Sequence, residues 1–169
     1  MNILCFGDSN TWGYKPDKTG RFNENIRWTA LLQKKLGPEY HIIEEGLCGR
    51  TTVFHDELRE GRRGLDMIGV TVEMHDPLDL VIIMLGTNDC KTRYGASASV
   101  IAKGLDQVIR KARLNASQHF NLLLSLRSTL VMVWENRILI LNLTRTLNLF
   151  PEILQMNTVK LHSRIMLHS

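Results

Sequence analysis

Cysteine is scarce in this sequence, and the last third of the chain, residues 114–169, lacks glycine, aspartate, tyrosine and cysteine altogether. The three cysteines are few and odd in number, which argues against a disulfide scaffold. Twelve glycines and a hydrophobic share of 44% argue against a collagen-like repeat and against a disordered chain. The 169 residues therefore predict one ordinary domain, long enough to bury a core, in a reduced intracellular setting.

Long apolar runs and targeting segments are also missing. Polar residues interrupt the leucine-rich last third so often that none of its stretches would span a bilayer. Met1 leads directly into a short apolar run without a basic leader, which is unlike a signal peptide. We therefore expect a cytoplasmic protein without a membrane partner.

The net charge of +4 is unevenly distributed. The last 56 residues hold five Lys or Arg and two Glu, so they carry +3 of it, and the first 113 residues are close to neutral. These basic residues stand singly among leucines and do not cluster or alternate with aromatic residues. The charge pattern therefore predicts no nucleic-acid partner.

Short apolar runs alternate with amphipathic stretches along most of the chain. The runs predict strands at residues 3–6, 41–43, 80–85 and 122–125, and the stretches predict helices at residues 28–36, 64–74 and 97–112. This alternation predicts the α/β class, with a parallel sheet covered by helices on both faces. In such sheets the chemistry lies in the loops that follow the carboxyl ends of the strands.

Three polar loops occupy these positions, and each contains a candidate site residue. Ser9 follows the first strand at the start of a short helix, where a hydroxyl can act as a nucleophile or where Asp8 or Ser9 can simply cap the helix. Gly49 offers an unobstructed backbone N–H, and Asn88 offers a side-chain amide. Taken singly, both are more typical of turns. Together the three predict a nucleophile with an oxyanion hole.

The three loops resemble the first three sequence blocks of the GDSL, or SGNH, hydrolases. The matching segments are Gly7-Asp8-Ser9-Asn10-Thr11-Trp12-Gly13, Gly46-Leu47-Cys48-Gly49-Arg50-Thr51-Thr52 and Leu85-Gly86-Thr87-Asn88-Asp89. The arylesterase and acyl-esterase branch is the most similar, and the resemblance covers about residues 1–113. It implies a flavodoxin-like three-layer α/β/α sandwich with a central parallel sheet.

The same resemblance implies hydrolysis of a small-molecule ester through an acyl-enzyme on Ser9. The N–H groups of Ser9 and Gly49 and the side chain of Asn88 would form the oxyanion hole, and Arg50 would either steer the substrate or pair with a nearby Glu. Relatives in this branch often assemble, so a homo-oligomer is an expectation by analogy. No cofactor is implied, and the spacing of the three cysteines indicates no metal site.

The Asp-x-x-His block that supplies the general base in this family is missing. No histidine has an aspartate three residues before it, whether in the last third (His119, His162, His168) or earlier in the chain (His41, His55, His75). The triad Asp and His are therefore not identifiable, and we expect impaired turnover. The alternatives are a non-catalytic pseudoenzyme and a flavodoxin-like module that binds a phosphate or a nucleotide through the first loop.

The chain is predicted to be a single domain over residues 1–169, with a family-like core at 1–113 and an atypical tail at 114–169. One hypothesis for the tail is a frameshift in the gene. If permissible codons for residues 129–147 are read in a shifted frame, they encode a loop rich in glycine and aspartate. A genuine tail would form helices that cover the sheet, or expose apolar surface that drives self-association.

Overall fold

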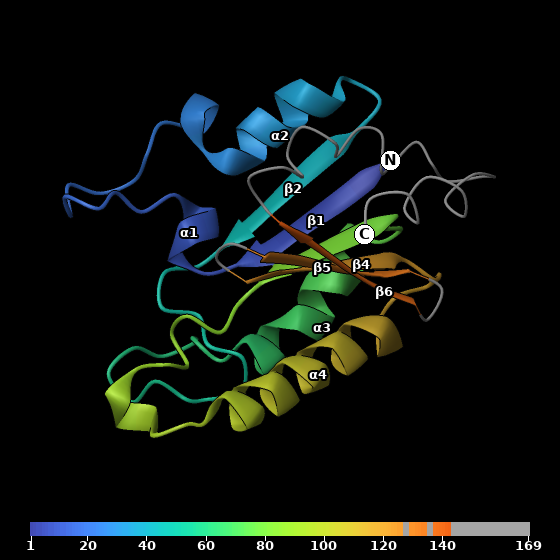
Figure 1. The fold of residues 1–169 in the computed structure, drawn as a ribbon. Coiled ribbons are helices and arrows are strands. Elements are labelled where there is room, and N and C mark those ends of the chain that lie inside the picture. Colours follow the sequence, from blue (N-terminus) through green and yellow to red (C-terminus); the bar gives the residue numbers. More distant parts are fainter. Residues whose placement is uncertain (127–128, 135–136, 143–169) are drawn as a thin grey trace.

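A six-stranded sheet forms the centre of the computed structural model, which describes residues 1–126, 129–134 and 137–142 (Figure 1). Its strands are β1 (Asn2–Gly7), β2 (His41–Gly46), β3 (Leu80–Met84), β4 (Asn121–Leu126), β5 (Thr129–Trp134) and β6 (Arg137–Asn142). Their order in the sheet is β2-β1-β3-β4-β5-β6. The pairs among β1 to β4 are parallel, whereas β5 and β6 extend the sheet in antiparallel fashion.

Helices lie in the connections between the parallel strands. They are α1 (Ser9–Trp12), α2 (Trp28–Leu36), α3 (Gly64–His75) and α4 (Ala98–Leu114), with two short 3-10 turns at Glu24–Ile26 and Thr92–Tyr94. The predicted helices at 28–36, 64–74 and 97–112 are confirmed to within two residues at each end. Within the described ranges, none of the helices combines the length and apolarity needed to cross a membrane.

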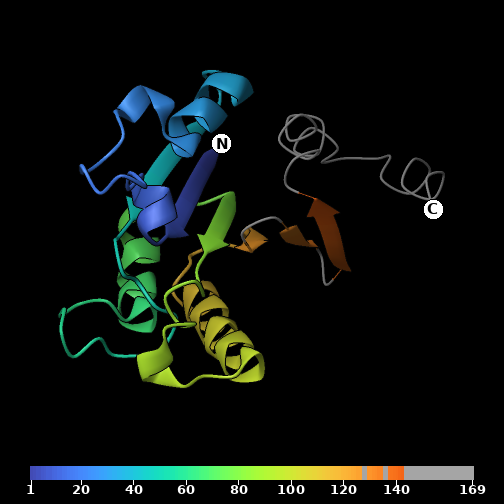
Figure 2. The same ribbon diagram turned by 60° about the vertical axis from the view of Figure 1, so that its left-hand side comes forward.

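The core has two halves, one on each face of the sheet. Side chains alternate along β1, so Ile3 and Cys5 lie in one buried cluster with Leu32 of α2. Leu4 and Phe6 lie in the other cluster, with side chains of α3 and α4. Figures 1 and 2 show the sheet between α2 on one side and α3 and α4 on the other. The predicted three-layer α/β/α sandwich is therefore confirmed, and the order β2-β1-β3-β4 is the flavodoxin-like one.

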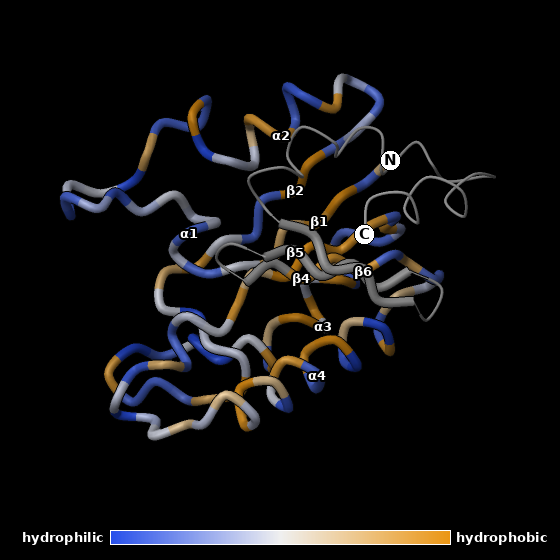
Figure 3. The backbone as a smooth tube through the Cα atoms, viewed as in Figure 1, coloured by the Kyte–Doolittle hydropathy of each residue, from blue (hydrophilic) through white to orange (hydrophobic). Residues whose placement is uncertain are grey.

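Sequence signals explain where the main helices begin and end. The side chain of Ser97 accepts a hydrogen bond from the N–H of Val100 and caps α4. Gly37 ends α2 in a conformation with φ +95°, which side chains rarely adopt, and its N–H donates to the carbonyl of Gln33. Figure 3 shows hydrophobic residues along β1 and hydrophilic residues in the outer loops.

The segment after β4 differs from the helical expectation. Strand β4 itself was predicted, but residues 129–134 and 137–142 are strands and not helices. Both pieces are rich in Leu, Val and Ile, and a short apolar segment next to a sheet edge pairs directly with that edge. His162 and His168 lie outside the described residues.

Candidate active site

The three loops of interest start from one edge of the sheet. Gly7 at the end of β1 is in register with Gly46 at the end of β2 and with Met84 at the end of β3. The carbonyl of Gly7 accepts a hydrogen bond from the N–H of Leu47 at 3.1 Å, which joins the first loop to the second. Parallel pairing therefore brings the loops that carry Ser9, Gly49 and Asn88 to the same edge.

Ser9 is the first residue of α1, a single helical turn. Asp8 caps this turn, because its Oδ1 accepts from the backbone N–H and from the side-chain amide of Asn10, both at 2.9 Å. Gly13 ends the turn with φ +82°, and its N–H donates to the carbonyl of Ser9 at 3.0 Å. The cap is therefore Asp8. The half-buried Ser9 hydroxyl makes no hydrogen bond to the part of the chain that the structure describes.

A close backbone approach holds α1 in place. A Cβ atom on Gly46 would lie 2.6 Å from the Cα of Trp12 and from the carbonyl carbon of Thr11, and closer still to the amide nitrogen of Trp12. Real Cβ atoms essentially never come within 3.0 Å of other heavy atoms. Only glycine at position 46 lets α1 sit directly on β2, and this fixes the position of Ser9 relative to the sheet.

Gly49 and Asn88, which the sequence suggests as oxyanion donors, are both buried. Gly49 is buried and has φ +87°, a conformation that favours glycine. Asn88 is 8% exposed, and its Nδ2 donates to the carbonyl of Arg50 at 3.0 Å. A primary amide has two N–H donors, so one remains after this bond. The bond also fixes the third loop against the second.

The side chain of Arg50 connects the ends of β1 and β2, where the first two loops begin. Its side chain is almost fully buried, and its Nη1 donates to the carbonyls of Gly7 at 2.8 Å and of Glu45 at 2.5 Å. The guanidinium carbon lies 3.9 Å from the centre of the Phe6 ring. Burial lowers the pKa of Arg50 to about 10. Arg50 therefore holds the loops together, and its contact with Glu45 is to the backbone carbonyl and not to the carboxylate.

Asp89 makes a second connection, between the second and third loops. The carboxylate is fully buried and accepts from the N–H of Thr52 at 2.9 and 3.1 Å, and from the Thr52 hydroxyl. Sequence reasoning treated Asp89 only as part of a matching block and missed this bonding. The sequence feature that could have indicated this bonding is an Asp directly after Asn88, because a buried carboxylate in a loop needs backbone N–H donors.

Asp8 is the acidic group nearest to Ser9 in the sequence, and it is fully buried. Burial raises its pKa above the ordinary value, while the hydrogen bonds from Asn10 and the charge of Arg50 lower it in part. Its second oxygen, Oδ2, is buried without a hydrogen-bond partner among the described residues. A carboxylate in this position opposes the binding of a phosphate by the first loop.

The four described histidines do not complete a triad. His41 begins β2 and His119 shortly precedes β4, so both lie at the opposite edge of the sheet. His75 ends α3, and its Nε2 lies 2.9 Å from Oε1 of Glu45. None of the hydrogen bonds in the described ranges joins a histidine to Ser9.

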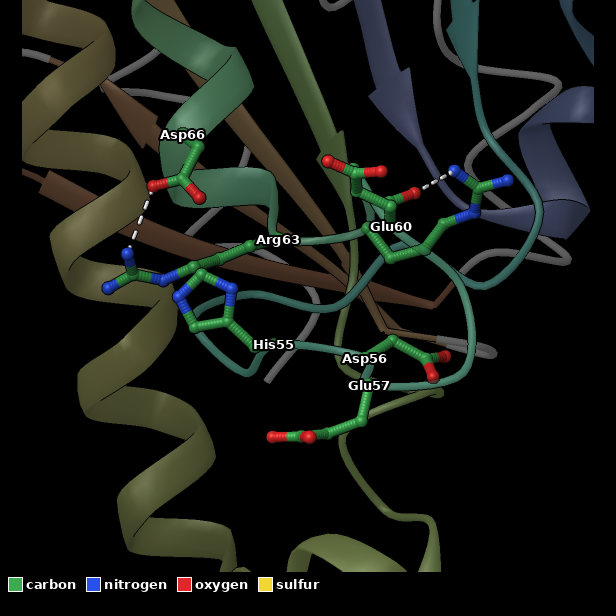
Figure 4. A pocket seen from close by; sticks show the side chains of 8 residues that line it. His55, Asp56, Glu57, Glu60, Arg63 and Asp66 are labelled. Atoms are coloured by element: carbon green, nitrogen blue, oxygen red, sulfur yellow. Dashed lines mark hydrogen bonds and ion pairs between the residues drawn. The ribbon is translucent and has the colours of Figure 1, made fainter.

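His55 alone of these four lies in one of the three loops. It is exposed and lines a pocket of about 460 Å³ together with acidic and basic side chains (Figure 4). An Arg63–Asp66 ion pair of 3.0 Å forms part of the wall. Among the residues that the structure describes, no group of three or more His, Cys, Asp or Glu is placed to hold a metal ion.

A family model described as GDSL-like lipase/acylhydrolase matches residues 5–145. The chain belongs to this family. The match to the GDSL-like family extends beyond the third sequence block and includes β4 to β6. No curated protein matches the chain.

Solved structures share the fold of this GDSL-like chain. An aryl esterase from M. smegmatis is 41% identical, with a TM-score of 0.66, over 68% of this chain and 55% of that one. A carbohydrate acetylesterase family member from Sinorhizobium meliloti is 36% identical, with a TM-score of 0.69, over 73% of this chain and 61% of that one. The carbohydrate acetylesterase Est24 from the same organism is 39% identical, with a TM-score of 0.64, over 68% and 55%. The chain thus spans 55% to 61% of the length of these structures.

Proposed function

We propose that this chain hydrolyses carboxylic esters, with Ser9 as the nucleophile and with Gly49 and Asn88 as oxyanion donors. One observation carries the proposal. Hydrogen bonds from Arg50 to Gly7 and from Asn88 to Arg50 tie the three loops together at the edge of the sheet where Ser9 begins α1. A pre-organised set of donors beside a serine is what acyl transfer needs, because such donors require no reorganisation during the reaction.

The proposed reaction has two steps. The Ser9 oxygen attacks the ester carbonyl while its proton passes to a general base. The N–H groups of Ser9 and Gly49 and the free N–H of Asn88 stabilise the resulting oxyanion. Collapse of this intermediate expels the alcohol, which takes up the proton, and leaves an ester between the acyl group and Ser9. A water molecule then attacks that ester, and the acid leaves with the serine proton restored.

We propose small acyl groups, acetyl above all, as the substrate class. The carbohydrate acetylesterases and the aryl esterase among the similar structures support this choice. Turnover is expected to be slow if no base reaches Ser9, because removing members of a triad leaves only a small residual rate. This chain spans only 55% to 61% of the length of these structures. The rate of full activity is therefore the rate of a longer protein that contains the same site.

The test measures hydrolysis of p-nitrophenyl acetate by the wild-type chain and by three variants. Ser9→Ala should reduce the rate to the background, and Asn88→Ala should reduce it about 100-fold, which is typical for the loss of one oxyanion donor. Ser99→Ala, at an exposed position in α4, is the matched control and should leave the rate unchanged. Equal rates in the wild type and in Ser9→Ala would refute the proposal.

Labelling with a fluorophosphonate separates the alternatives. The reagent reacts only with an activated serine, so labelling at Ser9 supports the esterase. Absence of both labelling and hydrolysis would instead favour a pseudoenzyme that binds its ligand without turnover. Mass spectrometry of the labelled peptide identifies the modified residue.

A further inference from the structure

Two arginines of the loop between β2 and α3 lie against Gly49. A Cβ atom on Gly49 would lie 3.3 Å from Nη1 of Arg59, and 3.6 and 3.8 Å from Cδ and Nε of Arg62. These side chains therefore cover the turn whose N–H is proposed as an oxyanion donor. Neither arginine belongs to the three matching sequence blocks.

The guanidinium of Arg59 has no hydrogen-bond or ion-pair partner among the described residues, although the backbone of Arg59 is anchored. Its N–H donates to the carbonyl of Asp56 at 3.1 Å. The Asp56 carboxylate is in turn buried, and it pairs with Arg93 at 2.6 Å and accepts from the N–H of Leu58 at 3.1 Å. Across the described chain, the Arg59 side chain has no hydrogen bond and no ion pair. A fixed loop thus presents a free cation beside Gly49.

Arg62 adds an unsatisfied donor at the same place. Its Nη1 donates to the carbonyl of Glu60 at 2.7 Å, but its Nε is buried and has no partner among the described residues. Buried donors in folded proteins are nearly always paired, so an unpaired one next to a candidate site points to an acceptor on a ligand.

Arg59 lies apart from the acidic residues of this loop. The pocket shown in Figure 4 is lined by acidic side chains, among them Glu57 and Glu60, and by Arg62 and Arg63, whereas Arg59 is not among its lining residues. Burial raises the pKa of the Cys48 thiol, and the positive charge of Arg59 is the largest influence that opposes this rise. The field of Arg59 therefore acts on the second loop, where Gly49 lies.

We propose that Arg59, together with Arg62, is a specificity-determining pair that binds a carboxylate on the alcohol part of the ester substrate. The inference rests on the proposed function. The acetyl group proposed above has no ionisable group, so the carboxylate of the substrate belongs to the alcohol part. A carboxylate accepts two parallel hydrogen bonds from a guanidinium fork, which an ammonium group cannot offer in the same geometry.

The experiment compares two acetyl esters of similar shape, 4-acetoxybenzoate and its methyl ester, of which only the first is an anion. The measured quantity is the ratio of their kcat/KM values. Arg59→Gln should lower the preference for the anion about three- to tenfold, because Arg59 is exposed and water screens its charge. Arg59→Lys should retain part of the preference. Arg113→Gln removes an exposed charge at the far end of α4 and should leave both rates unchanged.

Two results would overturn the inference: an unchanged ratio in Arg59→Gln, or a wild-type enzyme without preference for the anion. If no variant hydrolyses either ester, the proposed function fails, and binding then decides the inference alone. Ligand-observed NMR with 4-acetamidobenzoate and methyl 4-acetamidobenzoate measures that binding, since both amides resist hydrolysis. Weaker binding of the anionic amide to Arg59→Gln than to wild type supports the site, and equal binding refutes it. Circular dichroism confirms that each variant is folded.

Discussion

Gly46 is the position where one added methyl group should do the most damage to the candidate site. The new Cβ of Gly46→Ala would lie 2.6 Å from two backbone atoms of α1, the Cα of Trp12 and the carbonyl carbon of Thr11. Favourable carbon–carbon contacts lie at about 3.5–4.0 Å, so α1 has to move by roughly 1 Å. Backbone atoms cannot rotate away as the end of a side chain can. The cost should therefore reach about 3 kcal/mol, the upper end of the range for overpacked cores.

Urea denaturation followed by circular dichroism measures this cost. With a slope of about 2 kcal/mol per molar urea, Gly46→Ala should lower the unfolding midpoint by about 1.5 M. The shift of α1 also displaces Ser9, and a misplacement of about 1 Å lowers an enzymatic rate on the order of 100-fold. Hydrolysis of p-nitrophenyl acetate should fall accordingly.

Gly69→Ala is the matched control. Its Cβ would lie 3.1 Å from the side-chain atoms Nδ2 of Asn115 and Cε of Lys111, which can move aside. Alanine also favours a helix interior over glycine by about 0.5–1 kcal/mol, so this variant should unfold within about 1 kcal/mol of the wild type. Equal midpoints for Gly46→Ala, Gly69→Ala and the wild type would refute the view that glycine at position 46 is needed for the seating of α1.

Two further predictions concern buried carboxylates. Asp89→Ala leaves the buried donors of Thr52 unpaired and should lower the free energy of unfolding by about 2–4 kcal/mol in urea denaturation, whereas Asp106→Ala, which breaks an exposed pair, should cost at most about 0.5 kcal/mol. Because burial raises the pKa of Asp8, the folded protein keeps this proton to a higher pH than the unfolded chain, so Asp8 reduces stability as the pH rises above about 4. The stability of Asp8→Asn relative to the wild type should therefore increase from pH 4 to pH 7, and a constant difference would contradict the burial effect.

The sequence predicted strands β1 to β4 and the three polar loops at their carboxyl ends, because both depend on local patterns. Apolar runs at β1 and β3 and amphipathic spacing in α2 and α4 determine the layers, and the polar loops follow directly from the ends of the strands. The bonding inside the loops was not predictable in this way. Arg50 reaches the carbonyl of Gly7, 43 positions earlier, and Asp89 reaches Thr52, 37 positions earlier, so only the folded chain brings these groups together.

The β5–β6 hairpin was not predicted because an apolar segment without glycine fits a buried helix as well as a strand. Pairing decided between the two: β4 offers an open edge, and β5 pairs with it in antiparallel register, with Leu126 opposite Thr129. The antiparallel strands need no crossover helix, in contrast to the parallel strands before them. The change of strand direction falls between β4 and β5, inside the compositionally distinct segment that begins near residue 114.

The topology also limits where a base for Ser9 can come from. Strand β5 runs against β4, and β6 runs against β5, so the chain leaves β6 at Asn142 on the edge where Ser9, Gly49 and Asn88 lie. Four strand spacings separate β6 from β1, about 19 Å, which roughly six extended residues can span. Of the described histidines, His55 alone lies in a loop at this edge. A histidine base for Ser9, which the described hydrogen bonds do not supply, would therefore come from the loop of His55 or from the segment that leaves β6 at this edge.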